Sequence, residues 1–278
     1  MSTVKTIISL SRFANKGLSL RDKWLAFLVA GLGSRDLHRM KLRGFLLRCI
    51  NSLAIKGSVQ LALLLNSRRA FFSMRKGNEG DYLIGGELVT GMYGYGIPDF
   101  EPACIIDGGA NIGSFSISAM NYFPKAKLIC YEPDSANLQQ LYKNLALNKI
   151  TAEVKQLALW SREASLFYHA NLSHLGIVDE NAPGEPVCGT VPEIGPDCWL
   201  KLDIEGSEYE VVPALLKMGR YPRYISAEFH FFDTKGQSVI SLLREHGYKI
   251  NLVENFEDSI AIVSGYKDIG QQNERRGL

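Results

Sequence analysis

Acidic and histidine side chains end two apolar runs in the C-terminal half of the chain. Asp203 and Glu205 follow the first run, and Glu228 and His230 follow the second. Carboxylates and imidazoles can take up or release protons beside a reacting group, and neighbouring carboxylates raise one another's pKa toward neutrality. We therefore treat these four residues as the candidate catalytic group.

A second group of residues forms a glycine-rich turn after the apolar run 104–106. Asp107 ends that run, and Gly108, Gly109 and Gly113 follow within six residues, just before a helical pattern. Glycines carry no Cβ, so a ligand can approach their backbone closely. The free N–H groups at the start of the helix would face the same ligand.

The composition of this turn favours a cationic ligand over a pyrophosphate. A dinucleotide site requires a glycine where this chain has Ala110, which disfavours an NAD-dependent enzyme. The carboxylate of Asp107 would also repel a pyrophosphate, whereas S-adenosylmethionine carries a sulfonium and an ammonium group. We therefore expect this donor to be bound by Asp107, Gly108, Gly109, Ala110, Asn111 and Gly113.

The next apolar run, 127–131, leads to a second acidic position. Glu132 lies 19 residues after Gly113 and precedes Pro133, and an acid at about 20 residues past such a turn accepts hydrogen bonds from ribose hydroxyls. Asp134 is expected to cap the helix that follows. Ala158, after the third run, is expected near the adenine edge of the donor.

Four motifs in this order resemble those of the FkbM-type methyltransferase family. They are D-G-G-A-N-I-G at Asp107–Gly113, E-P at Glu132–Pro133, L-K-L-D-I-E-G-S-E at Leu200–Glu208 and E-F-H at Glu228–His230. The resemblance spans about residues 85–265. It implies a class I methyltransferase fold, S-adenosylmethionine as the cofactor, and methyl transfer to a hydroxyl of a sugar, glycan or natural product.

Two mechanisms fit the candidate catalytic group under this resemblance. In the first, His230 or Glu228 is the general base that takes the hydroxyl proton, while Asp203 or Glu205 orients the acceptor. In the second, Asp203, Glu205 and Glu228 bind a divalent ion such as Mg²⁺, which lowers the pKa of the hydroxyl. Lys201 is expected to pair with a neighbouring carboxylate.

Two other functions remain open from the sequence. A nucleic-acid methyltransferase could use a basic N-terminal region for phosphate contacts, but it is disfavoured because the chain lacks an N-P-P-Y or D-P-P-Y motif and a Pro-Cys dipeptide. The other alternative is a non-catalytic, membrane-associated binding module that retains the fold.

Strand and helix patterns alternate from residue 103 onward. This rhythm predicts an α/β, Rossmann-like fold with a mostly parallel sheet and helices on both faces, and the class I resemblance implies seven strands. The two runs 249–253 and 259–263 are expected to pair antiparallel at the end. The proline- and glycine-rich stretch 171–197 interrupts the rhythm, and we expect it to be an irregular acceptor-binding loop.

The charge distribution divides the chain. Residues 1–80 hold 15 lysines and arginines against 3 acidic residues, and we expect a mainly helical extension there, with two helices in 36–65 and short strands at 71–74 and 82–88. Residues 81–266 form the expected methyltransferase domain, and 267–278 a polar tail. The basic extension could bind an acidic partner or a membrane surface, or simply present solvated helix faces.

Cysteine content and hydropathy indicate the compartment. The five cysteines include no C-x-x-C pair, so neither a zinc site nor a disulfide framework is expected. No apolar run reaches 18 residues, so we expect no membrane-spanning helix. These features favour a cytoplasmic protein, with peripheral membrane association as an open alternative. The remaining histidines are expected to be structural: His38, His169, His174 and His246.

Overall fold

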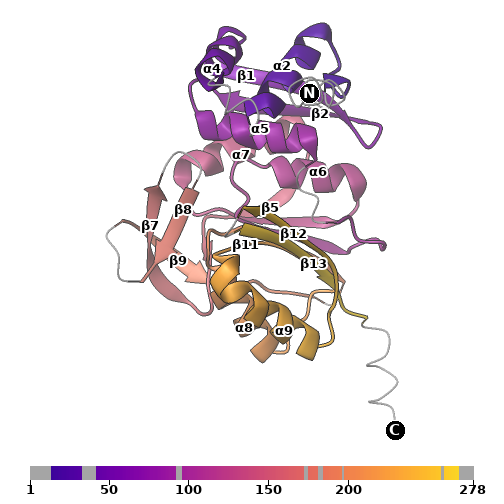
Figure 1. Cartoon of the computed structure of the whole chain (residues 1–278), viewed down its shortest axis with the longest axis vertical. Helices are drawn as coiled ribbons and strands as arrows, with labels where there is room; N and C mark the ends of the chain where they lie inside the picture. The colour runs from indigo at the N-terminus through magenta and orange to yellow at the C-terminus, as the bar shows by residue number, and fades with distance from the viewer. Residues whose placement is uncertain are drawn as a thin grey trace.

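The computed structural model describes residues 14–32, 42–91, 96–171, 175–180, 184–195, 197–257 and 260–268. Within these residues a seven-stranded sheet lies between two helical layers, with a four-stranded sheet at one side and a further N-terminal layer at one end (Figure 1). None of the helices in this part of the chain is long and apolar enough to cross a membrane.

The central sheet confirms the expected α/β architecture. Its strand order is β12-β13-β11-β10-β3-β4-β5. The strands from β11 to β5 are parallel, and β13 is antiparallel to both of its neighbours. The bounds are β3 Cys104–Gly108, β4 Lys127–Tyr131, β5 Ala152–Lys155, β10 Cys198–Leu202, β11 Tyr224–His230, β12 Lys249–Glu257 and β13 Ile260–Tyr266.

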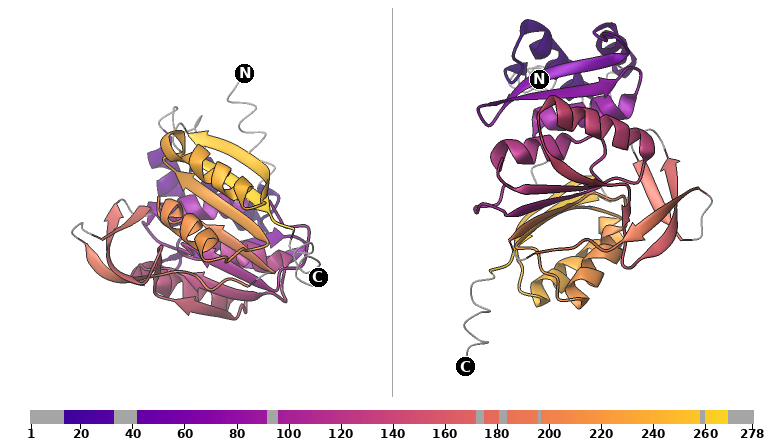
Figure 2. Two further views of the ribbon diagram at one scale, coloured as in Figure 1. Left: turned by 90° about the horizontal axis from the view of Figure 1, so that it is seen from below. Right: turned by 180° about the vertical axis from the view of Figure 1, so that it is seen from behind.

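Helices cover both faces of this sheet because its inner strands are apolar on both sides. On one face Ile105 and Trp199 pack with Phe115; on the other, Ile106 and Leu200 form a second core. The helices are α6 Ser114–Tyr122 and α7 Ser135–Leu147 on the first face, and α8 Glu208–Lys217 and α9 Gln237–Glu245 on the second. Figure 2 shows α8 and α9 lying across the second face of the sheet.

The strand order places a topological switch point between β3 and β10. From β3 the chain adds β4 and β5 on one side, and then returns to add β10 and β11 on the other. Ligands of open α/β sheets bind at this kind of switch point, beyond the carboxyl ends of the strands. The glycine turn lies at the end of β3, one acidic motif follows β10 and the other ends β11, so the fold brings the predicted donor and acceptor groups to the same edge.

The N-terminal layer lies against α6 and α7, on the side away from the sheet (Figure 1). Its apolar core is formed mostly by its own residues but also includes Ile112 and Ile117. A short π-helix, η1 Phe232–Gly236, follows β11 at the other end of the molecule. The elements of the layer are α2 Leu20–Leu32, α4 Arg43–Ser52, β1 Ser58–Leu65, β2 Arg68–Arg75 and α5 Glu79–Thr90.

Two elements expected in this layer are wrong. Residues 58–65 form a strand and not a helix, because they pair with β2 through a tight turn in which Asn66 and Ser67 both have positive φ. Residues 82–88 lie in α5 and not in a strand, because Asn78 accepts a hydrogen bond from the Asp81 amide and caps a helix there. The strand expected at 71–74 is confirmed within β2.

Several expectations concern residues outside the described part of the chain. These are the helical segments within 1–13 and 33–41, His38, His174 and residues 269–278 of the polar tail. The domain boundary at residue 81 stays a prediction, and α5 continues across it. Binding of an acidic partner or a membrane by the basic region also stays a prediction.

The stretch 171–197 is more regular than expected. It contributes β8 and β9 to a small sheet with the order β6-β9-β7-β8. The reason is that β7 offers both of its edges for antiparallel pairing. The bounds are β6 Ala158–Leu159, β7 Ala164–Asn171, β8 Leu175–Asp179 and β9 Glu185–Thr190.

Candidate active site

The glycine turn is held between β4 and β10. The amides of Gly109 and Ala110 both donate to the carbonyl of Tyr131, at 3.0 and 2.9 Å. Gly109 has a φ of 71°, and a Cβ at this position would overlap the carbonyl oxygen of Asp203. The turn therefore needs glycine at residue 109, both for its left-handed conformation and for its close contact with the strand end of β10.

Asp107 has partners that the sequence did not predict. The residue is fully buried; one carboxylate oxygen accepts from the Ser116 hydroxyl at 2.6 Å, and the other lies 3.1 Å from the Lys201 ammonium. We expected this carboxylate to face a cationic donor. The structure instead turns it into the protein and neutralises it, because Lys201 enters the same space from β10.

Lys201 is a buried cation beneath the glycine turn. Its ammonium donates to the carbonyls of Gly108 and Gly109 at 3.1 and 2.8 Å. Burial alone would lower the pKa of Lys201, but the charges of Asp107 and Asp203 outweigh burial and raise it. The expectation that Lys201 pairs with a carboxylate is confirmed, and the pair holds the turn from below.

Glu132 occupies the position expected for the ribose-binding acid, at the end of β4. Its two carboxylate oxygens accept from the amides of Asn111 and Asp134, at 2.7 and 2.9 Å. The side chain is buried, and burial raises the pKa of Glu132 to about 7. Asp134 caps α7 as expected, accepting from the Asn137 amide at 2.7 Å. Contact between Glu132 and a ribose stays a prediction.

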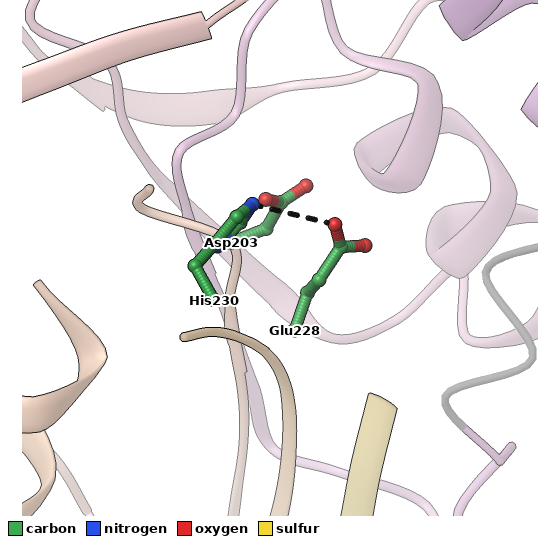
Figure 3. Close-up of side chains that lie close together, drawn as sticks. All are labelled: Asp203, Glu228 and His230. Atoms are coloured by element: carbon green, nitrogen blue, oxygen red, sulfur yellow. Dashed lines mark ion pairs between the residues drawn. The ribbon is translucent and has the colours of Figure 1, made fainter. Parts of the chain in front are cut away.

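The four candidate catalytic residues lie together, with Asp203 and Glu205 just after β10 and Glu228 and His230 in the last residues of β11. Figure 3 shows Asp203, Glu228 and His230 converging on one space. The His230 Nε2 atom lies 3.1 Å from the Glu205 carboxylate and 3.6 Å from that of Glu228. The sequence predicted that these strand ends meet, because parallel strands end at the same edge of a sheet.

The turn that carries Glu205 is shaped by Glu208. Glu205 has a φ of 56°, which is uncommon for a residue with a side chain and is often found at functional sites. Glu208 is fully buried and accepts from the amides of Ile204 and Gly206, at 2.7 and 2.8 Å. Its carboxylate also lies 3.9 Å from the His230 Nδ1 atom. Glu208 was not among the candidate catalytic residues, although it belongs to the same motif.

Burial and mutual charge shift the protonation of this cluster. Burial, followed by the charge of Asp203, raises the pKa of Glu205 to about 8, and the same causes raise that of Glu228 well above the ordinary range. Burial would lower the pKa of His230, but the carboxylates of Glu208, Glu205 and Asp203 outweigh it and raise it to about 10. The histidine is therefore an imidazolium at neutral pH, beside carboxylates with increased proton affinity.

The residues that could hold a metal differ from the predicted set. One ligand atom each from Asp203, Glu228 and His230 lies within 4.8 Å of the others. Glu205 was expected in this set, but its carboxylate contacts the histidine instead. A mixed oxygen and nitrogen set of this kind fits a divalent transition metal as well as Mg²⁺.

The glycine turn and the candidate catalytic group are in direct contact. The amide of Asp203 donates to the carbonyl of Gly108 at 3.1 Å, so the glycine turn and the acid–histidine cluster are adjacent. Tyr168 of β7 is buried, and the nearby carboxylates of Glu132 and Glu205 contribute to raising its pKa, after burial. The sequence gave no signal for Tyr168, because its position depends on the packing of the small sheet. Ala158 is buried in β6, beside Gly189 of β9.

Comparisons with known proteins point to one family. Residues 190–250 match the model of the methyltransferase FkbM domain. Methyltransferase sdnD from Sordaria araneosa is 43% identical over 53 residues, which cover 19% of this chain and 20% of that protein. Methyltransferase 1 from Beauveria bassiana is 24% identical over 147 residues, which cover 41% of this chain and 59% of that protein.

Solved methyltransferases with similar structures share little sequence with the chain. The crystal structure of methyltransferase FkbM from Methylobacillus flagellatus is 13% identical, with a TM-score of 0.45, over 95% of this chain and 60% of that one. Fibrillarin from Aeropyrum pernix is 14% identical, with a TM-score of 0.40, over 61% and 68% of the two chains.

The family match covers the acidic motif after β10 and the E-F-H motif at the end of β11, which carry all four candidate catalytic residues. The resemblance of this chain to the FkbM-type methyltransferases is thereby confirmed.

Proposed function

We propose that this protein is an S-adenosylmethionine-dependent methyltransferase that methylates a hydroxyl of a sugar, glycan or other small molecule. The observation that carries the proposal is the contact between Asp203 and the glycine turn. A donor lying on the turn would present its methyl group beside the acid–histidine cluster, where a hydroxyl could be deprotonated as it attacks.

The reaction needs a base and no redox partner. The acceptor oxygen forms a bond to the methyl carbon while the carbon–sulfur bond breaks, so the sulfonium becomes the neutral thioether of S-adenosylhomocysteine. The hydroxyl proton must leave at the same time. We assign Glu228 as its acceptor, because burial raises the pKa of Glu228 above that of an ordinary carboxylate. His230, as an imidazolium 3.6 Å away, fixes this carboxylate and balances its charge.

A metal-assisted version of the same reaction is favoured by one observation. Asp203, Glu228 and His230 offer three ligand atoms close together. A divalent ion held there would lower the pKa of a bound hydroxyl and orient the acceptor. In this version the histidine must give up its proton to bind the ion, and Glu228 is a ligand instead of the base.

Methyl transfer to a panel of acceptors tests the proposal. Purified protein is incubated with methyl-labelled S-adenosylmethionine and with monosaccharides, oligosaccharides, phenols, amines or RNA, and labelled products are identified by mass spectrometry and NMR. Labelled methyl ethers of the monosaccharides, oligosaccharides or phenols support the proposal. Label found only on amines or RNA, or no transfer to any acceptor, contradicts it.

The same assay, repeated after treatment with a chelator, distinguishes the two versions of the mechanism. Turnover that persists after dialysis against EDTA supports the base mechanism. Turnover that is lost, and is restored by Mg²⁺ or Mn²⁺ but not by Ca²⁺ alone, supports the metal-assisted version.

A further inference from the structure

We propose that the N-terminal layer is part of the donor-binding site, and that the side chain of Asn144 is the residue through which it positions the glycine turn. The proposal takes the identity of the donor from the proposed function. It assigns a role to residues that no motif marks.

Asn144 of α7 joins two backbone segments that are far apart in the sequence. Its Oδ1 atom accepts from the Ser73 amide of β2 at 2.8 Å. Its Nδ2 atom donates to the Ser73 carbonyl at 3.1 Å and to the Ile112 carbonyl at 2.8 Å. Ile112 lies inside the glycine turn, and Asn144 is fully buried. The Asn144 side-chain amide therefore connects the outer edge of the β1–β2 hairpin to the glycine turn.

Asn148, one helical turn later, makes the same clamp on β2 without the turn contact. It accepts from the Phe71 amide at 2.8 Å and donates to the Phe71 carbonyl. The two asparagines replace the partner strand that the edge of β2 lacks, because an amide side chain offers the same donor and acceptor as a peptide group. The comparison separates two roles: both residues attach the layer, but only Asn144 reaches the turn.

A second chain of contacts leads from the layer to Glu132. Arg75 of β2 pairs with Asp81 at 2.6 Å and donates to the Asn137 side chain at 2.7 Å. The Asn137 amide donates to Asp134, and the Asp134 amide donates to Glu132. The position of the predicted ribose-binding acid is thus connected to β2 through a continuous series of hydrogen bonds.

Apolar packing supports the same connection. The side chain of Ile112 is fully buried in the core of the N-terminal layer, and not in either core of the sheet. The glycine turn therefore contacts the N-terminal layer through both a hydrogen bond and an apolar side chain. If the layer were only an appended module, the turn would be complete without it.

The matched variants Asn144→Ala and Asn148→Ala test this proposal. Both remove the clamp on β2, so both are expected to lower the melting temperature. Loss of the Ile112 hydrogen bond is expected to raise the Kd for S-adenosylhomocysteine by about three- to tenfold in Asn144→Ala only, as for one lost hydrogen bond. Equal Kd changes in the two variants, or no change in Asn144→Ala, overturn the proposal.

Amide hydrogen exchange without any donor gives an independent readout. Residues 108–113 are expected to exchange faster in Asn144→Ala than in wild type, and to be unchanged in Asn148→Ala. Failure of wild type to bind S-adenosylhomocysteine would refute the proposed function, whereas this exchange comparison would still decide whether Asn144 positions the turn.

If Asn144→Ala does not fold, hydrogen exchange of the wild-type protein tests the proposal instead. Coupling between two sites is reciprocal, so S-adenosylhomocysteine is expected to slow exchange of the β2 amides around Ser73. The proposal is contradicted if the β2 amides exchange at an unchanged rate when S-adenosylhomocysteine saturates its site.

Discussion

The Lys201 ammonium lies 3.1 Å from the Asp107 carboxylate, and both side chains are buried. The pair joins β10 to β3 at the point where the glycine turn begins. A buried pair of this kind contributes little when it is intact, but it becomes costly when one partner is removed, because the other charge is left without compensation. The pair, together with the hydrogen bonds from Lys201 to the Gly108 and Gly109 carbonyls, thus fixes the turn.

Replacing Lys201 by methionine is expected to destabilise the fold strongly. The free energy of unfolding should fall by about 3–5 kcal/mol, because Asp107 is left as a buried, unpaired charge. Urea unfolding measures this change. The matched control is Lys127→Met, which breaks an exposed pair with Glu153 and should change the free energy of unfolding far less, because solvent screens exposed charges. The double variant Asp107→Asn/Lys201→Met should be more stable than Lys201→Met; a double variant that is less stable contradicts this role of the pair.

Donor affinity is expected to rise with pH through the titration of Glu132. The pKa of this group is raised to about 7, and ribose hydroxyls donate to its ionised form. Between pH 6 and 8 the ionised fraction rises about tenfold, so the Kd for S-adenosylhomocysteine should fall by up to about that factor. Calorimetry across this range measures the effect, and Glu132→Gln should bind weakly with a flat pH profile. A wild-type profile as flat as that of the variant rules out this role.

The same pKa has the opposite consequence for the stability of the donor-free protein. Glu132 binds its proton more tightly in the folded state, whose pKa is about 7, than in the unfolded state, whose pKa is the ordinary 4.5. Its contribution to stability is therefore present at low pH and is lost as the pH rises from 4.5 to 7. Melting temperatures of wild type minus those of Glu132→Gln should decline across this window, and a rising difference would contradict the assignment.

Removing the proposed base is expected to affect turnover and not donor binding. Glu228→Gln should lower kcat by about 10²–10⁴-fold, as for loss of a general base, while the Kd for S-adenosylhomocysteine changes little. Glu210→Gln, which alters an exposed carboxylate of α8, is the matched control and should retain full activity. Unchanged turnover in a Glu228→Gln/His230→Ala variant would exclude both residues as the base.

The elements that the sequence predicted well have local signals at their ends. The bounds of β4 agree with the apolar run predicted at 127–131, and α7 begins directly after Asp134, whose side chain caps it as predicted. The meeting of Asp203 and Glu228 was also predictable, since it depends only on parallel strands ending at one edge.

The elements that were mispredicted depend on tertiary packing. The run at residues 58–65 is apolar enough for either a helix or a strand, and its pairing with β2 decides between them. The glycines at 85 and 86 weaken a helix prediction. In the structure Gly86 lets α5 approach the backbone of Val29 in α2, where a Cβ would lie 2.6 Å from its carbonyl oxygen.

The site residues that were missed act through contacts between distant segments. In the sequence, Asn144 is an ordinary residue of an amphipathic helix. Its hydrogen bonds to the Ser73 amide and carbonyl depend on the position of β2. The burial of Asp107 was missed for the same reason, because it requires Lys201 to enter from the neighbouring strand. Residue types at strand ends could be predicted, whereas their partners could not.

The central claim is that the glycine turn binds S-adenosylmethionine beside the acid–histidine cluster. The most direct measurement is calorimetric titration of S-adenosylhomocysteine into wild type, Gly109→Ala and the control Gly219→Ala. Both glycines have positive φ, but an added Cβ overlaps the Asp203 carbonyl only at Gly109 and meets nothing within 4 Å at Gly219. We predict saturable one-to-one binding by wild type and Gly219→Ala, and none by folded Gly109→Ala. The account is contradicted if wild type does not bind, or if Gly109→Ala binds as tightly as wild type.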